Sequence, residues 1–142
     1  MTFHINQKIF EQFPELCVGV VVLESLDNTD SNEDITKMMR TSERLVQEKY
    51  ADVAHAELPE IQCWRKAYKS FGAKGYASSI EALVKRVVKG EQIYNISDLV
   101  NLYNALSLKY MLPFGGENLD AMEGDLALTF ADGGEECFLL GV

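Results

Sequence analysis

The sequence predicts an α+β fold in which a mixed or antiparallel sheet is combined with a central helical block. Strand-like apolar segments lie near both ends of the chain, and the middle carries apolar residues at helical spacing. Regular βαβ alternation does not occur, and neither does a GxGxxG loop or a GKS/T loop, which argues against Rossmann and P-loop folds. The length of 142 residues predicts a single domain, residues 1–142.

The first third of the chain is predicted as strand, helix and strand, followed by a long helix. Residues 2–5 are short and alternating, as in a half-buried strand. Residues 16–26, with the sequence LCVGVVVLESL, are rich in valine and flanked by polar residues, which is typical of a buried strand. After an acidic loop, residues 33–50 are predicted as a helix whose inner stripe consists of Ile35, Met38, Met39, Leu45 and Val46.

Two shorter helices are predicted next. Residues 58–71 have Pro59 near the first turn and Gly72 just past the end, the asymmetry expected of a helix. Its apolar face is expected to pack into the core, although aromatic side chains are also suited to stacking on bases. This face comprises Ile61, Trp64, Ala67, Tyr68 and Phe71. A loop of small residues then leads to a short helix over residues 79–89.

The most informative segment is residues 98–120, where an apolar helical pattern leads directly into a turn with proline and glycine. Ser97 and Asp98 stand where a helix N-cap is expected. The helix is expected to end near Met111, because Pro113 disfavours a helical conformation at the residue before it. The apolar residues at helical spacing are Leu99, Leu102, Tyr103, Leu106 and Tyr110.

Asn104 is the polar exception on this helix, and the turn after it contains Gly115 and Gly116. Glycine permits backbone conformations and close approaches that a side chain would block. One amide on the packed side of a helix that ends in a glycine turn predicts a polar corner, where backbone donors can meet a small ligand or a nucleotide end. The structural alternative is that Asn104 caps or ties a neighbouring loop.

The C-terminal part is predicted to close with a β-hairpin. Residues 126–130 and 137–140 flank a turn that contains two glycines. Four acids precede it and follow the glycine turn: Glu117, Asp120, Glu123 and Asp125. A carboxylate in this group can in principle orient a water. The alternative is a set of solvated charges, with Asp120 or Asp125 bound to backbone amides of the turn.

Composition argues against several classes of protein. No basic N-terminal segment precedes an apolar stretch and no apolar run approaches 18 residues, so we expect neither secretion nor membrane insertion but a cytoplasmic protein. Cys17, Cys63 and Cys137 form no CxxC pair, and their apolar flanks predict buried thiols. The two histidines, His4 and His55, belong to no catalytic or metal-binding motif, so no metal and no cofactor is expected.

The charge is negative in total but unevenly distributed. A net charge of −9 argues against broad binding of nucleic acid, DNA included. Residues 64–90, however, contain seven basic residues and one acid, Glu81, so this segment carries +6 and the rest of the chain −15. We expect the segment to guide an RNA end, such as that of tRNA, or a phosphorylated ligand to one face; the alternative is two ordinary helices with solvated lysines. The RNA-binding candidates are Arg65, Lys69, Lys85 and Arg86.

A series of motifs occurs in a fixed order between residues 64 and 141. They are WRKAY with FG at residues 64–72, SSIEAL at 78–83, NIxxLVNLYN at 95–104, LPxG at 112–115 and LDxMxGD at 119–125. This order resembles the B3/B4 domain, which occurs in the beta chain of bacterial phenylalanyl-tRNA synthetase, where it hydrolyses mischarged tyrosyl-tRNA, and also as stand-alone proteins. The resemblance implies a B3/B4-like fold, and either hydrolysis of a mischarged aminoacyl-tRNA ester or binding of the tRNA acceptor end.

The resemblance also implies roles for particular residues. The synthetase editing site has a Thr-Asn pair followed by a His in a Pro-x-His turn. Alignment on the prolines places Tyr103 at the threonine, Asn104 at the asparagine and Gly115 at the histidine, so the asparagine alone is retained. Asn104 is therefore the catalytic candidate, which would hold substrate or water. The substrate-binding candidates are Tyr103, Gly115, Gly116 and Asn101. In the family, further strands and an acidic residue that reads the para-hydroxyl of tyrosine would follow Val142, so this chain resembles the first portion of the domain.

Three functions remain open at this point. The first is deacylation without a covalent nucleophile, because an aminoacyl ester is labile enough for an ordered water and backbone donors to suffice. The second is a non-catalytic module that binds RNA, a small ligand or a protein through the same surface. The third is self-association through an unpaired strand edge near Val142.

Overall fold

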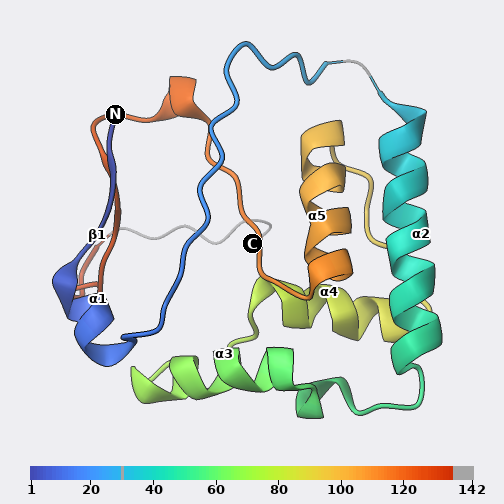
Figure 1. Ribbon diagram of the computed structural model, residues 1–142, viewed down its shortest axis with the longest axis horizontal. Coiled ribbons are helices and arrows are strands. Elements are labelled where there is room, and N and C mark those ends of the chain that lie inside the picture. Colours follow the sequence, from blue (N-terminus) through green and yellow to red (C-terminus); the bar gives the residue numbers. More distant parts are fainter. Residues whose placement is uncertain (30, 136–142) are drawn as a thin grey trace. The chain divides into compact units, whose positions relative to one another are not determined.

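The computed structural model of the chain describes residues 1–29 and 31–135 (Figure 1). They divide into two compact units: a central unit, residues 25–116, and a terminal unit formed by the described residues before 25 and after 116. Helices and strands occur together, which confirms the predicted α+β composition. The elements are β1 (Phe3–Ile5), α1 (Gln7–Gln12), α2 (Glu33–Tyr50), the 3-10 helix η1 (His55–Glu57), α3 (Pro59–Ser70), α4 (Ser79–Val88), α5 (Asp98–Tyr110), the 3-10 helix η2 (Leu119–Ala121) and β2 (Leu126–Leu128).

The terminal unit contains a two-stranded parallel sheet. β1 pairs with β2 in a register that sets Phe3 opposite Leu126, so the strand predicted at residues 2–5 is confirmed. Just before β2, Asp125 binds a backbone amide, as one alternative predicted. Its partner is not in the glycine turn, however, because Asp125 Oδ1 accepts a hydrogen bond of 2.6 Å from the N–H of Thr2.

The predicted C-terminal hairpin is not confirmed. Its first arm, residues 126–130, begins as β2, but β2 runs parallel to β1. Its second arm, residues 137–140, lies outside the described residues. The strand pair found within residues 1–29 and 31–135 is parallel, so the antiparallel part of the fold prediction is not confirmed either.

The prediction of a buried strand at residues 16–26 is wrong. Residues 17–24 have no regular secondary structure, and no backbone hydrogen bond joins them to another described residue. A valine-rich segment is stable as a strand only when another strand pairs with it, and none does so in the described part of the chain. The valines are therefore exposed: Val20 to 57%, Val21 to 82% and Val22 to 61%.

The central unit is helical, and its helices were predicted well. α2 and α5 lie side by side, and α4 packs against both (Figure 1). The bounds of α2, α3, α4 and α5 agree with the predicted ranges within one or two residues. Polar side chains begin three of these helices by accepting hydrogen bonds from backbone N–H groups of the first turn; these N-caps are Asn32, Ser78 and Ser97.

The hydrophobic core of the central unit lies where α2, α4 and α5 meet, and it also receives Ile61 from α3. Its buried residues are Met39, Val46, Tyr50, Leu58, Ile61, Ile80, Val84, Val87, Ile93, Ala105, Leu108 and Met111. The predicted stripe of α2 is confirmed in part, since Met39 and Val46 are buried whereas Met38 and Leu45 are exposed. On α3, Trp64 packs against the core, but Phe71 is exposed.

The packed face of α5 differs from the predicted one. Asn101, Ala105 and Leu108 are buried, whereas Tyr110 is exposed. Apolar residues surround most of this helix, so the pattern by itself does not determine which side packs. The contact with α2 decides the orientation instead, and it turns Asn101 to the inside.

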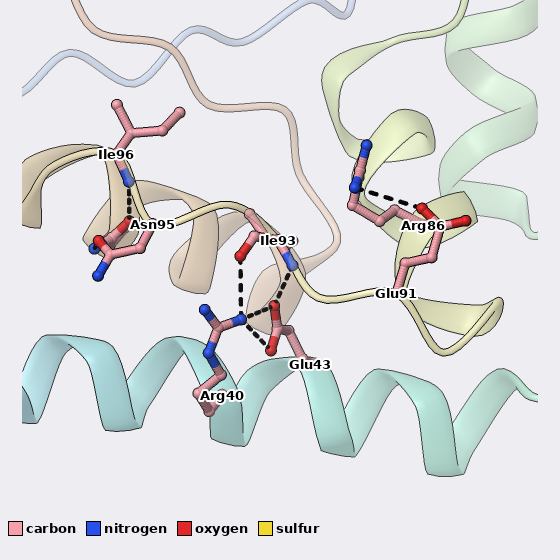
Figure 2. Close-up of polar contacts among 8 residues, drawn as sticks. Arg40, Glu43, Arg86, Glu91, Ile93, Asn95 and Ile96 are labelled. Atoms are coloured by element: carbon pink, nitrogen blue, oxygen red, sulfur yellow. Dashed lines mark hydrogen bonds and ion pairs between the residues drawn. The ribbon is translucent and has the colours of Figure 1, made fainter.

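A buried carboxylate on α2 holds the connection between α4 and α5, residues 89–97. Glu43 is only 8% exposed, and its Oε1 accepts a hydrogen bond of 2.6 Å from the backbone N–H of Ile93. Arg40 donates from Nη1 to both carboxylate oxygens of Glu43, at 2.6 and 2.8 Å, and to the carbonyl oxygen of Ile93, at 3.1 Å. Side chains of α2 therefore bind both polar backbone groups of Ile93 (Figure 2).

Side chains also hold the rest of this connection. Asn101 donates from Nδ2 to Oδ1 of Asn95 at 2.5 Å, and its Oδ1 accepts a bond of 3.3 Å from the N–H of Ile96. Arg86 Nη1 lies 3.4 Å from Oε2 of Glu91 (Figure 2). The connection contains no helix or strand, so these contacts provide the partners that regular structure would otherwise supply. They fix the beginning of α5 relative to α2 and α4.

Replacement of Glu43 by alanine is expected to destabilise the protein by about 3–5 kcal/mol, because it leaves the N–H of Ile93 unpaired and the guanidinium of Arg40 without its carboxylate. Urea unfolding followed by circular dichroism measures the change. Glu48→Ala is the matched control, since Glu48 pairs with Arg44 on the same helix while both side chains are more than half exposed. Its expected cost is below about 1 kcal/mol. Equal losses of stability in the two variants would contradict the role of Glu43 in holding Ile93.

The amides of residues 18–24 are expected to exchange with solvent nearly as fast as those of an unfolded peptide, because they donate no hydrogen bond to another described residue. Hydrogen–deuterium exchange with mass spectrometry measures this. Peptides from α2 in the same digest are the internal control and should be protected. Protection of residues 18–24 equal to that of α2 would show that a strand pairs with this segment.

Candidate functional site

The candidate site lies at the C-terminal end of α5 and in the loop that follows, residues 112–116. The carbonyl oxygen of Ser107 accepts hydrogen bonds from the N–H groups of Met111 and Leu112, and its hydroxyl donates to the carbonyl oxygen of Leu112. Met111 adopts a left-handed conformation with φ 55°, which costs a non-glycine residue roughly 1–2 kcal/mol. Burial of its side chain offsets this cost. The helix therefore ends where the sequence predicted, and the chain turns into Pro113.

The two glycines of this loop are exposed, but their conformation does not require glycine. Neither has a positive φ, and a Cβ on Gly115 would meet no atom within 4 Å. A Cβ on Gly116 would lie 3.5 Å from Cε1 of Tyr103, which is an ordinary van der Waals distance. The expectation that they allow a special conformation is therefore wrong. The loop nevertheless folds back against α5 at Tyr103, and the N–H groups of Gly115 and Gly116 donate no hydrogen bond to a described residue.

Asn101 and Asn104 lie one turn apart on α5, but their surroundings differ. Asn101 is 0% exposed, and its amide is bound to Asn95 and Ile96. Asn104 is half-buried, and its amide makes no hydrogen bond within the described part of the chain. The role of tying a neighbouring loop, considered for Asn104, thus belongs to Asn101. The side-chain carbonyl oxygen and NH₂ group of Asn104 thus bind no other described residue.

Polar groups in the middle of α5 and in the loop after it are each of a kind that binds a carbonyl oxygen or an oxyanion. The amide of Asn104 provides a donor and an acceptor, and Gly115 and Gly116 provide backbone donors. Tyr103 on α5 lies near Gly116 in this loop, since a Cβ added at Gly116 would lie 3.5 Å from its ring. A hollow of about 210 Å³ is present elsewhere in the central unit, between α2 and the end of α4 beside Gly90, and it contains none of the predicted substrate-binding residues.

The basic segment forms two neighbouring helices that an ion pair connects. Arg65 on α3 donates from Nε to both carboxylate oxygens of Glu81 on α4, at 3.1 Å each, and from Nη2 to Oε1. Glu81 is 4% exposed, whereas 43% of the Arg65 side chain stays accessible. The hydrogen bonds to Glu81 raise the pKa of Arg65 above its ordinary value. The single acid of this segment therefore neutralises one arginine at a buried position.

The other predicted RNA contacts differ in their partners. Lys69 and Lys85 are exposed and form no ion pair with a described residue. Arg86 pairs with Glu91, and its guanidinium also lies 4.5 Å from the centre of the Tyr94 ring. The α3–α4 surface keeps further exposed lysines without an ion pair in the described structure: Lys66, Lys74 and Lys89.

Cysteines and histidines form no reactive group in the described structure. Cys17 and Cys63 are exposed, so the prediction of buried thiols is wrong for both, and Cys137 lies outside the described residues. Apolar neighbours in sequence do not bury a thiol when it points away from the core. His4 is exposed and His55 is half-buried. Within residues 1–29 and 31–135, no three potential ligands gather to hold a metal ion, and no helix combines the length and apolar character needed to cross a bilayer.

Three buried polar residues that position these surfaces were not identified from the sequence: Glu43, Glu81 and Ser107. Glu43 lies four residues after Met39 and three before Val46, and both of these are buried. The sequence signal for such a residue is an acid spaced three or four residues from buried apolar residues on the same helix. An unpaired carboxylate is rarely placed at such a position, so a partner is expected. The same signal is present at Glu81, three residues before Val84.

Comparison with known protein families finds that the sequence model of the B3/4 domain matches residues 63–142, which is more than half of the chain. The matched range contains α3, α4, α5 and the loop at residues 112–116. It therefore includes all residues that the sequence predicted for substrate and RNA binding. No match was found among curated proteins, and none among solved structures.

Asn101→Ala is expected to destabilise the protein by about 1–3 kcal/mol, because it leaves the N–H of Ile96 and the side chain of Asn95 without their partner. Asn104→Ala, the matched control on the same helix, is expected to change stability by less than about 0.5 kcal/mol, since its amide has no hydrogen bond to another described residue to lose. Chemical unfolding of both variants measures the difference. A larger loss for Asn104→Ala would contradict the assignment of the two amides.

Proposed function

Because this chain belongs to the B3/4 domain family, we propose that it binds the acceptor end of tRNA and hydrolyses the ester of a mischarged aminoacyl-tRNA. Membership of the family suggests a module related to nucleic-acid binding or editing. The tRNA partner, the hydrolysis and a cytoplasmic place of action are parts of the proposal.

The observation that carries the proposal is the amide of Asn104, which makes no hydrogen bond to a described residue. The polar atoms of this amide are accessible to solvent, since no buried side-chain nitrogen or oxygen in the described part of the chain lacks a partner, so a ligand can take the place of the water that binds them. The residue before it, Tyr103, lies near Gly116, and the N–H groups of Gly115 and Gly116 likewise donate no hydrogen bond to a described residue. Donors of this kind bind a carbonyl oxygen and stabilise the negative charge that develops on it.

The proposed reaction is the hydrolysis of a carboxylic ester. A water oxygen attacks the carbonyl carbon, and the resulting tetrahedral intermediate carries negative charge on the former carbonyl oxygen. The bond between this carbon and the ribose oxygen then breaks, the ribose oxygen takes up a proton that the attacking water has lost, and the products are a free amino acid and tRNA. An oriented water and fixed donors are sufficient for such a labile ester, so no covalent nucleophile is required.

Particular residues have separate roles in this proposal. Asn104 holds the water or the carbonyl oxygen, and the N–H groups of Gly115 and Gly116 bind the carbonyl oxygen or the terminal ribose. Tyr103 lines the proposed site where α5 and the loop approach each other. Asn101, predicted as a substrate contact, positions α5 instead, because its amide is buried and bound within the fold. The RNA-binding residues are Arg65, Lys69, Lys85 and Arg86.

A second candidate function is RNA binding without catalysis. It is supported by Gly115, which stands where the resembled editing site has a histidine and which contributes no side chain to the chemistry. The lysines of the α3–α4 surface would then account for the function by themselves, because phosphate neutralisation supplies most of the non-specific affinity for RNA.

Asn104→Ala is expected to lower the rate of ester hydrolysis on its best substrate by about 10²-fold, the usual effect of removing one donor to an oxyanion. A panel of correctly and wrongly charged tRNAs, with tyrosylated phenylalanine tRNA included, is scored for loss of the ester. Gln92→Ala is the matched control, because it removes an exposed amide from the α4–α5 connection and should leave the rate unchanged.

Two results of this assay would revise the proposal in different ways. A rate for Asn104→Ala equal to that of the wild type would remove Asn104 from the mechanism while leaving the activity in place. Absence of cleavage of every ester by the wild-type protein, together with salt-sensitive binding of tRNA, would establish the non-catalytic function instead.

A further inference from the structure

We propose that Glu81 is a positioning residue for RNA binding: it fixes the guanidinium of Arg65 so that the edge formed by Nη1 and Nη2 is presented to a phosphate of the RNA backbone. The inference rests on the proposed binding of RNA, for which it specifies one contact and the residue that orients it.

The hydrogen bonds of Arg65 leave a defined edge of its guanidinium open. Nε and one hydrogen of Nη2 point to the two carboxylate oxygens of Glu81. Nη1 and the second hydrogen of Nη2 have no partner in the described part of the chain. Two parallel N–H donors on one planar edge match the geometry of two phosphate oxygens, which a lysine ammonium cannot reproduce.

The burial of Glu81 makes this orientation stable. Glu81 is 4% exposed and lies in the first turn of α4, where its backbone N–H donates to the Ser78 hydroxyl at 3.4 Å. A carboxylate at such a position cannot leave its partner without losing its only compensation for desolvation. Arg65 is thus held before RNA arrives, which reduces the entropy lost when a flexible side chain becomes ordered on binding.

The neighbouring lysines support a phosphate contact at this position. Lys69 follows Arg65 by one turn on α3, and Lys85 follows Glu81 by one turn on α4. Each lysine therefore lies about 6 Å along its own helix from its member of the ion pair. The ion pair therefore has an exposed lysine one turn further along each helix, which adds positive charge for the binding of phosphates.

For Glu81→Gln, the inference predicts a change in RNA affinity opposite to the one expected from charge alone. Glu81→Gln removes a negative charge from a basic surface, so charge alone would strengthen RNA binding and make it more sensitive to salt. If Glu81 positions Arg65, the same change weakens binding, and the loss of one phosphate contact lowers the salt dependence by up to about one unit of the log–log slope.

The test measures binding of unacylated tRNA by fluorescence anisotropy at several salt concentrations. We expect Glu81→Gln and Arg65→Lys each to weaken binding by about three- to tenfold, and the double variant to be no weaker than either single variant, because both changes remove the same contact. Glu91→Gln is the matched control: it removes one carboxylate from the exposed pair with Arg86 and should leave binding equal or tighter. Circular dichroism checks that each variant is folded. If Glu81→Gln unfolds the protein, Arg65→Lys alone tests the phosphate contact.

The outcomes separate this inference from the proposed function. Wild-type affinity or tighter binding in Glu81→Gln, or unchanged affinity in Arg65→Lys, overturns the role of Glu81 while RNA binding itself stands. A wild-type protein that binds no tRNA overturns the RNA-binding surface, and the inference with it. Equal losses in Glu81→Gln and Glu91→Gln would also overturn it, because the effect would then not be specific to the buried carboxylate.

Discussion

The carboxylate of Glu43 is the constraint on which the arrangement of the central unit depends. The connection between α4 and α5 has no regular structure, yet Ile93 within it belongs to the buried core. Burial of a residue requires partners for its backbone N–H and C=O groups, and here α2 supplies both through Glu43 and Arg40 (Figure 2). The apolar side chain can enter the core because this polar pair binds its backbone.

This arrangement links the core to the candidate site through α5. Asn101 ties the beginning of the helix to the same connection, and Ser107 fixes its end, from which the loop at residues 112–116 departs. The positions of Tyr103 and Asn104 between these two ties are therefore set by buried hydrogen bonds rather than by the exposed groups around them. A helix fixed at both ends is a suitable support for a binding site, because its backbone need not be ordered anew when a ligand binds.

The sequence predicted the helices of the central unit well because their signals are local. Caps such as Ser97 and breakers such as Pro113 act within one turn, so α5 begins and ends as expected. The exposed valines of residues 17–24 and the inward face of α5 were predicted wrongly, since a strand needs a partner and a helix packs where its neighbours allow. For the site, the helical pattern and the resemblance selected Asn104, and the charge distribution selected the basic residues. The hydrogen bonds of the buried Asn101 and Glu81 side chains could not be predicted in this way, because they depend on the fold.

The burial of Glu81 explains how an acidic chain keeps a basic surface. Residues 64–90 contain one acid, and the fold places its carboxylate inside, where it neutralises Arg65 from the core side. An exposed acid at this point would repel a polyanion directly, whereas a buried one acts on the polyanion only through the arginine that it orients. The lysines around it are left without acidic partners in the described structure, so the local field stays positive despite a net charge of −9. Burial of Glu81 thus determines both the charge that this surface presents and the direction in which Arg65 presents it.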